Sequence, residues 1–106
     1  MTPEITVADL KAKRDAGETF VLLDVREPDE LATVALPWAQ AIPMGDVPQR
    51  LDQLPQDREI VVMCHHGGRS ERVTRFLNSN GFPNAKNLAG GIDAYAVEIE
   101  PGLARY

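Results

Sequence analysis

The sequence contains one cysteine among its 106 residues, and no apolar run in it approaches the ~20 residues of a membrane-spanning helix. A lone cysteine excludes both a disulfide within the chain and a second, resolving cysteine. Lysines and arginines are fewer than acidic residues, the formal net charge is −5, and no basic cluster indicates a nucleic-acid or anionic-membrane surface. The first five residues also lack the basic and apolar regions of a signal peptide, so we expect a cytoplasmic protein.

The chain has the length of one compact domain, and no Pro/Gly/Ser-rich linker divides it, so we expect a single domain over residues 1–106. Apolar runs over 20–23 and 60–63 predict strands that are buried on both faces. The remaining pattern predicts helices over about 7–16, 29–33, 47–54 and 92–99, a helix that follows Ser70, and short strands at 39–41 and 87–88. This alternation over short connections predicts an α/β sandwich, with a mostly parallel central sheet and helices on both faces.

Polar residues and glycines mark where some of these helices begin and end. Thr6 and Asp9 have the spacing of a capping box, with aspartate in place of the preferred glutamate. Gly17 suits the position just after the end of that first helix. Ser70 is the predicted N-cap of the helix that follows the strand at 60–63, because a serine side chain can bond the first free amides.

The strand at 60–63 ends at Cys64, and a polar stretch with two glycines follows it. A free thiol with a pKa near ~8.5 is only a few per cent thiolate at neutral pH, whereas a helix N-terminus and a nearby cation both favour the anion. Arg69 supplies the cation, and Gly67 and Gly68 allow amides to turn toward the sulfur. The alternative is a small buried core residue, but that role needs neither the glycines nor the arginine. We therefore interpret Cys64 as a nucleophile.

Two histidines, His65 and His66, directly follow the cysteine and raise the question of a metal site. Three adjacent residues in one tight loop do not readily point at one ion, and no second ligand pair occurs elsewhere in the sequence. We therefore predict no metal and no cofactor, and we expect both imidazoles to face solvent or substrate. The pattern does not identify either histidine as a general base.

A second group of charged residues follows the strand at 20–23. Asp24 and Arg26 end that strand, and Glu30 comes one helical turn later. They either line the pocket around the thiol or form ion pairs and caps that hold the loops. We favour the second interpretation, since buried charges are usually paired. Trp38 either lines the rim of a pocket or fills the edge of the core, and the sequence does not separate the two.

Three motifs together resemble those of the single-domain rhodanese family of sulfurtransferases. They occur in the family's order and span nearly the whole chain. Residues 64–70 resemble its active-site loop, Cys-x-x-Gly-x-Arg-Ser, and residues 24–30 resemble its signature Asp-Val-Arg-Glu-x-x-Glu. Residues 90–95 resemble its element Gly-Gly-Ile-x-Ala-Trp, with Tyr95 in place of tryptophan.

The resemblance implies a rhodanese-like fold and a sulfurtransferase that needs no cofactor. Cys64 would attack the outer sulfur of thiosulfate or a persulfide, carry it as a cysteine persulfide and pass it to cyanide or another thiol. Asp24 and Arg26 would brace the site. A partner protein could also supply or accept the sulfur, whereas no nucleic acid or membrane is expected. The predicted substrate-binding residues are the rest of the loop, namely His65, His66, Gly67, Gly68, Arg69 and Ser70.

Two other functions compete with this prediction. A module that only relays sulfur for a partner protein would use the same persulfide chemistry, so the sequence does not reject it. A cysteine phosphatase has five residues between its cysteine and arginine, whereas four residues separate Cys64 from Arg69. The shorter loop suits a single sulfur atom better than a phosphate group.

The segment Val34–Trp38 lacks two glycines and a histidine of the family's pattern, and the active-site loop lacks an additional basic residue that often assists thiosulfate binding. We therefore expect thiosulfate to be a poorer donor than a persulfide.

Overall fold

The computed structural model describes residues 2–106, and within them five strands form one sheet in the order β1-β5-β4-β2-β3. Every neighbouring pair of strands is parallel, so the predicted mostly parallel sheet is parallel throughout the described residues. The strands are β1 (Glu4–Ile5), β2 (Phe20–Asp24), β3 (Gln40–Ala41), β4 (Glu59–Met63) and β5 (Ala85–Leu88). The predicted α/β architecture is therefore confirmed.

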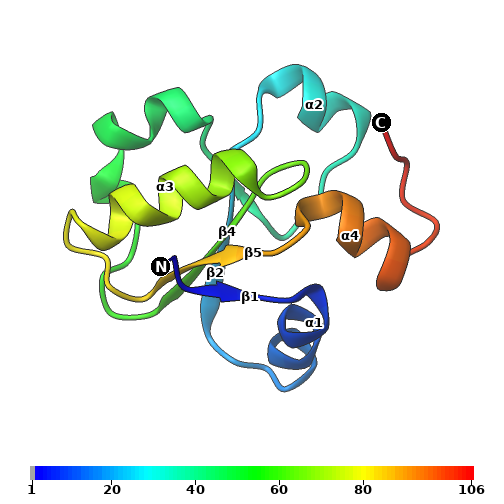
Figure 1. The fold of residues 1–106 in the computed structure, drawn as a ribbon, viewed down its shortest axis with the longest axis horizontal. Helices are drawn as coiled ribbons and strands as arrows, with labels where there is room; N and C mark the ends of the chain where they lie inside the picture. Colours follow the sequence, from blue (N-terminus) through cyan, green and yellow to red (C-terminus); the bar gives the residue numbers. More distant parts are fainter. Residues whose placement is uncertain (1) are drawn as a thin grey trace.

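Helical segments cover both faces of this sheet (Figure 1). They are α1 (Val7–Asp15), α2 (Pro28–Thr33), the 3₁₀ segments η1 (Met44–Gln49) and η2 (Leu51–Gln53), α3 (Gly68–Asn78) and α4 (Gly91–Glu98). One apolar cluster lies between the sheet and α1 with α4, and the other lies between the sheet and α3 with η1. No helix within residues 2–106 is long and apolar enough to span a membrane.

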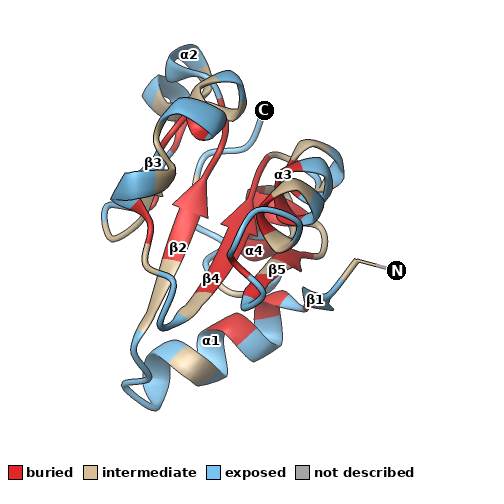
Figure 2. Ribbon diagram, turned by 90° about the vertical axis from the view of Figure 1, so that its left-hand side faces the viewer, coloured by how far each residue is buried: buried red, intermediate tan, exposed pale blue. Residues whose placement is uncertain are grey.

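The central strand β4 divides its side chains between these two clusters. Val61 and Met63 pack on the α1/α4 face, whereas Ile60, Val62 and the following Cys64 pack on the α3 face. This alternation is the two-residue period of a strand, and both sets are buried because helices cover both faces. Figure 2 shows the buried strands at the centre of the molecule. The alternation continues past the end of β4 and directs the Cys64 side chain toward α3.

Some element boundaries differ from the predictions. The capping box of α1 is confirmed, since the Asp9 amide donates to Thr6 Oγ1 over 3.1 Å and the Thr6 amide donates to the Asp9 carboxylate over 3.2 Å. The prediction of Ser70 as an N-cap is wrong, because α3 begins at Gly68 and its N-cap is Gly67. Gly67 has a φ of +114°, a left-handed conformation that a glycine adopts without steric cost. The turn at Gly67 lets the helix begin three residues before the predicted start.

The segment expected as one short helix over 47–54 forms two 3₁₀ segments instead. Pro48 lies inside η1 and has no N–H, so a regular α-helical bond cannot form there. Strand β1 was not predicted from the sequence, because no apolar run marks its exposed Glu4 and buried Ile5. Trp38 packs edge-on against Phe20, with ring centroids 6.3 Å apart, and lies under the guanidinium of Arg14. It therefore packs at the edge of the core near the start of β2 and also lines a surface cavity next to Arg14, so both expected roles apply.

Candidate active site

Cys64 lies where β4 ends, at the carboxyl edge of the parallel sheet, the usual place for a ligand site in such folds. The neighbouring strand β2 ends at Asp24, which is in register with Met63. The Cys64 residue is 1% exposed, and its Sγ accepts hydrogen bonds from the Gly67 amide over 3.1 Å and from the Ser70 hydroxyl over 3.2 Å. The strand, the loop and the first turn of α3 therefore meet at the sulfur.

These donors lower the pKa of the thiol. Burial by itself raises the pKa of Cys64, because it disfavours the charged thiolate. The Ser70 hydroxyl and the amides of Ser70, Gly67 and His66 act in the opposite direction, and together they lower the pKa below its ordinary value. A buried cysteine that only filled the core would have a raised pKa. The geometry thus favours a thiolate, as a nucleophile requires.

Ser70 connects the sulfur to a residue that the sequence did not single out. Its hydroxyl lies 2.6 Å from Oδ1 of the buried Asn87, and the Asn87 amide group donates to the Gly67 carbonyl over 3.3 Å. A hydroxyl has one proton, so Ser70 donates either to Asn87 or to Cys64 at any moment. Asn87 therefore holds both the serine and the turn at Gly67. No local pattern could have identified Asn87, because it lies on β5 and is 17 positions from Ser70 in the sequence.

The N-terminus of α4 fixes the backbone of the loop from the other side. The amide of Ile92 donates to the Cys64 carbonyl over 2.9 Å, and the amide of Asp93 donates to the His65 carbonyl over 3.1 Å. Gly91 has a φ of +60°, and a Cβ there would lie 2.5 Å from the Cys64 carbonyl oxygen and 2.4 Å from that of His65. A side chain at this position would push the loop away, so the glycine is needed for the close approach.

Arg69 directs its guanidinium toward α2. Its two terminal nitrogens donate to the two carboxylate oxygens of Glu30 over 2.6 and 2.8 Å. This bidentate pair lowers the pKa of Glu30 and raises that of Arg69. Sequence reasoning placed Arg69 in the loop and favoured an ion pair or a cap for Glu30, but it did not pair the two residues. The cation that was expected to serve the loop is therefore largely neutralised by a carboxylate.

Asp24 and Arg26 form a buried ion pair beside this one, with 1% and 0% of the two side chains exposed. The guanidinium reaches one Asp24 oxygen over 2.7 Å and also donates to the backbone carbonyls of Val34 and Glu30 over 2.9 and 3.4 Å. These bonds join the end of β2 to the first turn of α2 and to its C-cap residue. The arrangement agrees with a bracing role, which we retain as a proposal.

The histidines pack against the end of the described chain. The His65 ring stacks on Tyr106, with centroids 3.8 Å apart and an interplanar angle of 8°, and it also contacts the His66 ring at 3.9 Å. Burial lowers the pKa of His65, and its Nε2 is buried without a hydrogen-bond partner in the described residues. The Tyr106 hydroxyl donates to Glu30 over 2.7 Å and accepts from Arg26 over 3.1 Å.

Sequence reasoning missed Tyr106 entirely, and no motif marks it. His66 is exposed, with Nδ1 3.9 Å from an oxygen of Asp93, and Asp93 pairs more closely with Arg105 over 2.9 Å. In the part of the chain that the structure describes, no group of three His, Cys, Asp or Glu side chains is close enough together to hold a metal ion. The chemically prominent group is therefore the buried thiol with its hydrogen-bond donors.

Comparisons with known proteins agree with this geometry. The sequence model of the rhodanese-like domain family matches residues 6–98. The Bacillus subtilis protein named "Putative sulfurtransferase YtwF" is 41% identical over 92% of this chain and 94% of its own length. The "Putative sulfur carrier protein YrkF" of the same organism is 37% identical over 92% of this chain, which spans 53% of that protein. A solved rhodanese-like domain protein from Staphylococcus aureus superposes with a TM-score of 0.86 at 30% identity, covering 99% of each chain.

Proposed function

The chain belongs to the rhodanese-like domain family, and we propose that it is a sulfurtransferase that carries sulfane sulfur on Cys64. The observation that carries the proposal is that the Cys64 sulfur is buried at the edge of the sheet and accepts hydrogen bonds from the Ser70 hydroxyl and the Gly67 amide. The same donors that lower the pKa of the thiol can hold the anionic outer sulfur of a persulfide. Expected site residues are Cys64 as nucleophile and the loop from His65 to Ser70 as the binding cradle.

The reaction proceeds in two displacements. In the first, the Cys64 thiolate attacks the outer sulfur of the donor, a new S–S bond forms, and the donor's S–S bond breaks. The leaving group takes the electron pair, as sulfite from thiosulfate or as a thiolate from a persulfide. In the second, an acceptor thiolate or cyanide attacks the outer sulfur of the Cys64 persulfide, and the Cys64 thiolate departs with its electron pair. No net oxidation or external reductant is required.

The geometry favours a persulfide over thiosulfate as the donor. Thiosulfate is a small dianion that needs a free positive charge near the sulfur, but Arg69 is already paired with Glu30. A persulfide brings a single negative charge, which the loop amides can accept. This donor preference follows from the ion pair and is part of the proposal.

A sulfur carrier that serves a partner protein is the second candidate. It is favoured by the similarity to YrkF, which is named as a sulfur carrier protein. Carrier and enzyme share the first displacement and differ in the second. A carrier releases its sulfur rapidly only to a partner protein, whereas an enzyme also turns over with a small thiol or with cyanide.

The test is intact-protein mass spectrometry after incubation with glutathione persulfide or thiosulfate. We expect the mass of one added sulfur atom, faster loading from the persulfide, and removal of the sulfur by cyanide. Cys64→Ala should gain no sulfur while it keeps its circular dichroism spectrum. Failure of the wild-type protein to load from either donor would refute the proposal, and equal loading of Cys64→Ala would refute the site.

A further inference from the structure

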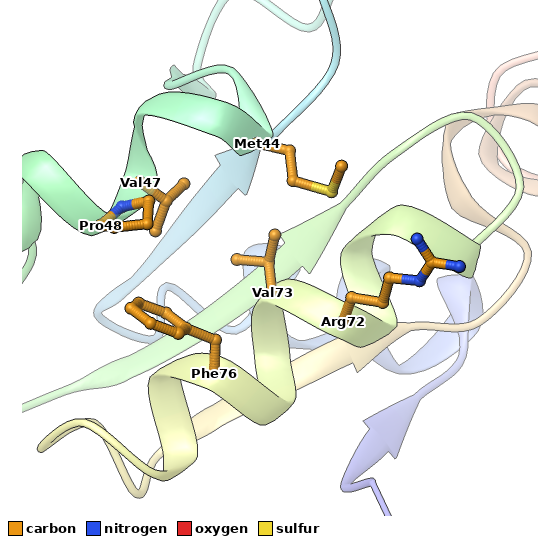
Figure 3. A pocket seen from close by; sticks show the side chains of 6 residues that line it. All are labelled: Met44, Val47, Pro48, Arg72, Val73 and Phe76. Atoms are coloured by element: carbon orange, nitrogen blue, oxygen red, sulfur yellow. The ribbon is translucent and has the colours of Figure 1, made fainter.

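A groove lies on the protein surface between η1 and α3, with a volume of about 140 Å³. Figure 3 shows the side chains around it, five of them apolar and one an arginine. Its lining residues are Met44, Val47, Pro48, Arg72, Val73 and Phe76. A cavity of this size is enough for one aromatic ring or one branched aliphatic side chain, because a cavity of about 150 Å³ in another protein binds benzene.

The groove lies beside the active-site loop. Val47, Val73 and Cys64 belong to the same buried cluster on the α3 face of the sheet, and Met44 and Phe76 pack against it. Helix α3 begins at Gly68, directly after the loop, and Arg72 is four residues further along. At a rise of 1.5 Å per residue, Arg72 is about 6 Å along the helix axis from that first residue. A molecule seated in the groove would therefore lie next to the loop that holds the sulfur.

Arg72 provides a positive charge at this groove. It is exposed, and among residues 2–106 no carboxylate pairs with it, whereas Arg69 pairs with Glu30 and Arg75 lies 3.8 Å from Glu71. Of the three arginines on this helix, Arg72 is therefore the one whose charge no neighbouring carboxylate of residues 2–106 offsets. The whole chain has a net charge of −5, so the charge of Arg72 differs in sign from that of the protein as a whole.

We propose that the groove docks an acidic polypeptide segment of the protein that exchanges sulfur with Cys64. One apolar side chain of the segment fills the groove, and a neighbouring carboxylate pairs with Arg72. A buried apolar anchor surrounded by charges is the usual arrangement at protein interfaces. The overall negative charge repels an acidic partner from most of the surface, and the unpaired charge of Arg72 attracts it to the groove. That the docked protein exchanges sulfur with Cys64 rests on the proposed function, whereas binding of an acidic segment in the groove does not.

The experiment uses three synthetic peptides that carry no sulfur, together with the full chain labelled with ¹⁵N. The first peptide has leucine and phenylalanine flanked by two acidic residues on each side. The second replaces the acidic residues by lysine, and the third replaces leucine and phenylalanine by serine. We expect only the first to shift the amide resonances of Val47, Val73 and Phe76 in a saturable way at up to millimolar concentration. The shifts should weaken in 0.5 M NaCl, because the Arg72 contact is exposed.

Two variants locate the binding contact. Arg72→Glu should weaken binding of the acidic peptide by about fivefold or more, which is the upper range for an exposed ion pair. Arg75→Glu is the matched control, since Arg75 lies on the same helix but outside the groove, and it should change affinity by less than twofold. Equal weakening by both variants would show a diffuse charge effect and would overturn the proposal.

Other occupants give distinct results. Phenylacetate is the small-molecule probe, and if it matched the affinity of the acidic peptide, the groove would be a small-ligand subsite and the proposal would be wrong. Shifts with the lysine peptide of equal size would also overturn it. Because no peptide contains sulfur, a negative result here leaves sulfur loading of Cys64 intact. Mass spectrometry of the same sample therefore separates failure of the docking site from failure of the proposed function.

Discussion

The two sides of the Cys64 loop are held by different physical means. On one side, which we call the ionic flank, Asp24, Arg26, Glu30, Arg69 and Tyr106 are joined by hydrogen bonds of 2.6 to 3.1 Å. On the other side, the apolar flank, Met44, Val47, Val73 and Phe76 contact one another without such bonds. Directional bonds specify one position for each group, whereas apolar packing tolerates a gap between side chains. The ionic flank therefore fixes the loop, and the apolar flank is where a groove remains.

The strongest way to break the ionic flank is Asp24→Asn. The change keeps the shape of the side chain but leaves the guanidinium of Arg26 buried without its counter-charge. Removing one partner of a buried pair costs about 3–5 kcal/mol of unfolding free energy, and we expect a loss in that range. Urea denaturation followed by circular dichroism measures it.

Glu71→Gln is the matched control, because it removes one carboxylate from an exposed pair whose atoms are 3.8 Å apart. It should change the unfolding free energy by less than about 0.5 kcal/mol. If Asp24→Asn cost no more than this control, charge would not hold the ionic flank. The folded fraction of Asp24→Asn should still load sulfur on Cys64, and complete loss of loading would assign Asp24 a part in the chemistry instead of bracing.

An intermediate effect is expected at the hydroxyl of Ser70, which donates to the sulfur from the first turn of α3. Ser70→Ala removes a donor to the sulfur, so the pKa of Cys64 should rise. A hydrogen bond to a charged group contributes about 1.5–3 kcal/mol, so the rate of alkylation by iodoacetamide at pH 7 should fall about tenfold or more. Because the wild-type pKa is the lower one, the wild-type rate should reach its plateau at a lower pH than the variant's.

Ser79→Ala serves as the control, since Ser79 is the exposed C-cap of the same helix and makes no contact with the sulfur. Its pH–rate profile should match that of the wild-type protein. A Ser70→Ala profile that also matched would show that the amides alone, and not the hydroxyl, set the pKa of the thiol.

The smallest effect is expected at Tyr106, which is 43% exposed. Tyr106→Phe keeps the ring that stacks on His65 and removes the hydroxyl that joins Glu30 to Arg26. The loss should be about 0.5–1.5 kcal/mol of unfolding free energy. Tyr106→Ala also removes the stacked ring, which adds a similar amount. Equal stability of all three proteins in urea would show that this residue does not tie the ionic flank together.

The sequence predicted the parts of the fold that depend on local patterns. The buried strands were visible as apolar runs, and the α1 capping box was visible as the spacing of Thr6 and Asp9. Ser70 was misassigned for an equally local reason, because serine favours the N-cap position. In the structure the N-cap is Gly67, whose left-handed backbone lets α3 begin at Gly68, before Ser70. The residue instead became a donor to the thiol, which the cap rule does not anticipate.

Contacts between distant residues were the part that the sequence could not specify. Asn87 is 17 positions from Ser70, and Tyr106 is 80 positions from Arg26. Such pairs form only when the sheet brings β4 beside β5 and when the last residues turn back over α2. Asp24, Arg26 and Glu30 were predicted as ion pairs or caps and Arg69 as a substrate-binding residue, but the pairing of Arg69 with Glu30 required the three-dimensional structure.

The close approach of α4 also gives the loop two sides of opposite polarity. The carbonyl groups of Cys64 and His65 both point at the first amides of α4. A trans peptide unit directs its N–H opposite to its carbonyl, so the amides of His65 and His66 point away from that helix. The negative ends of these two peptide dipoles are thus bound by α4, whereas their positive ends point to the other side of the loop, where the His66 amide bonds the Cys64 sulfur. This polarity favours a negative charge at the sulfur, and the close approach of Gly91 makes it possible.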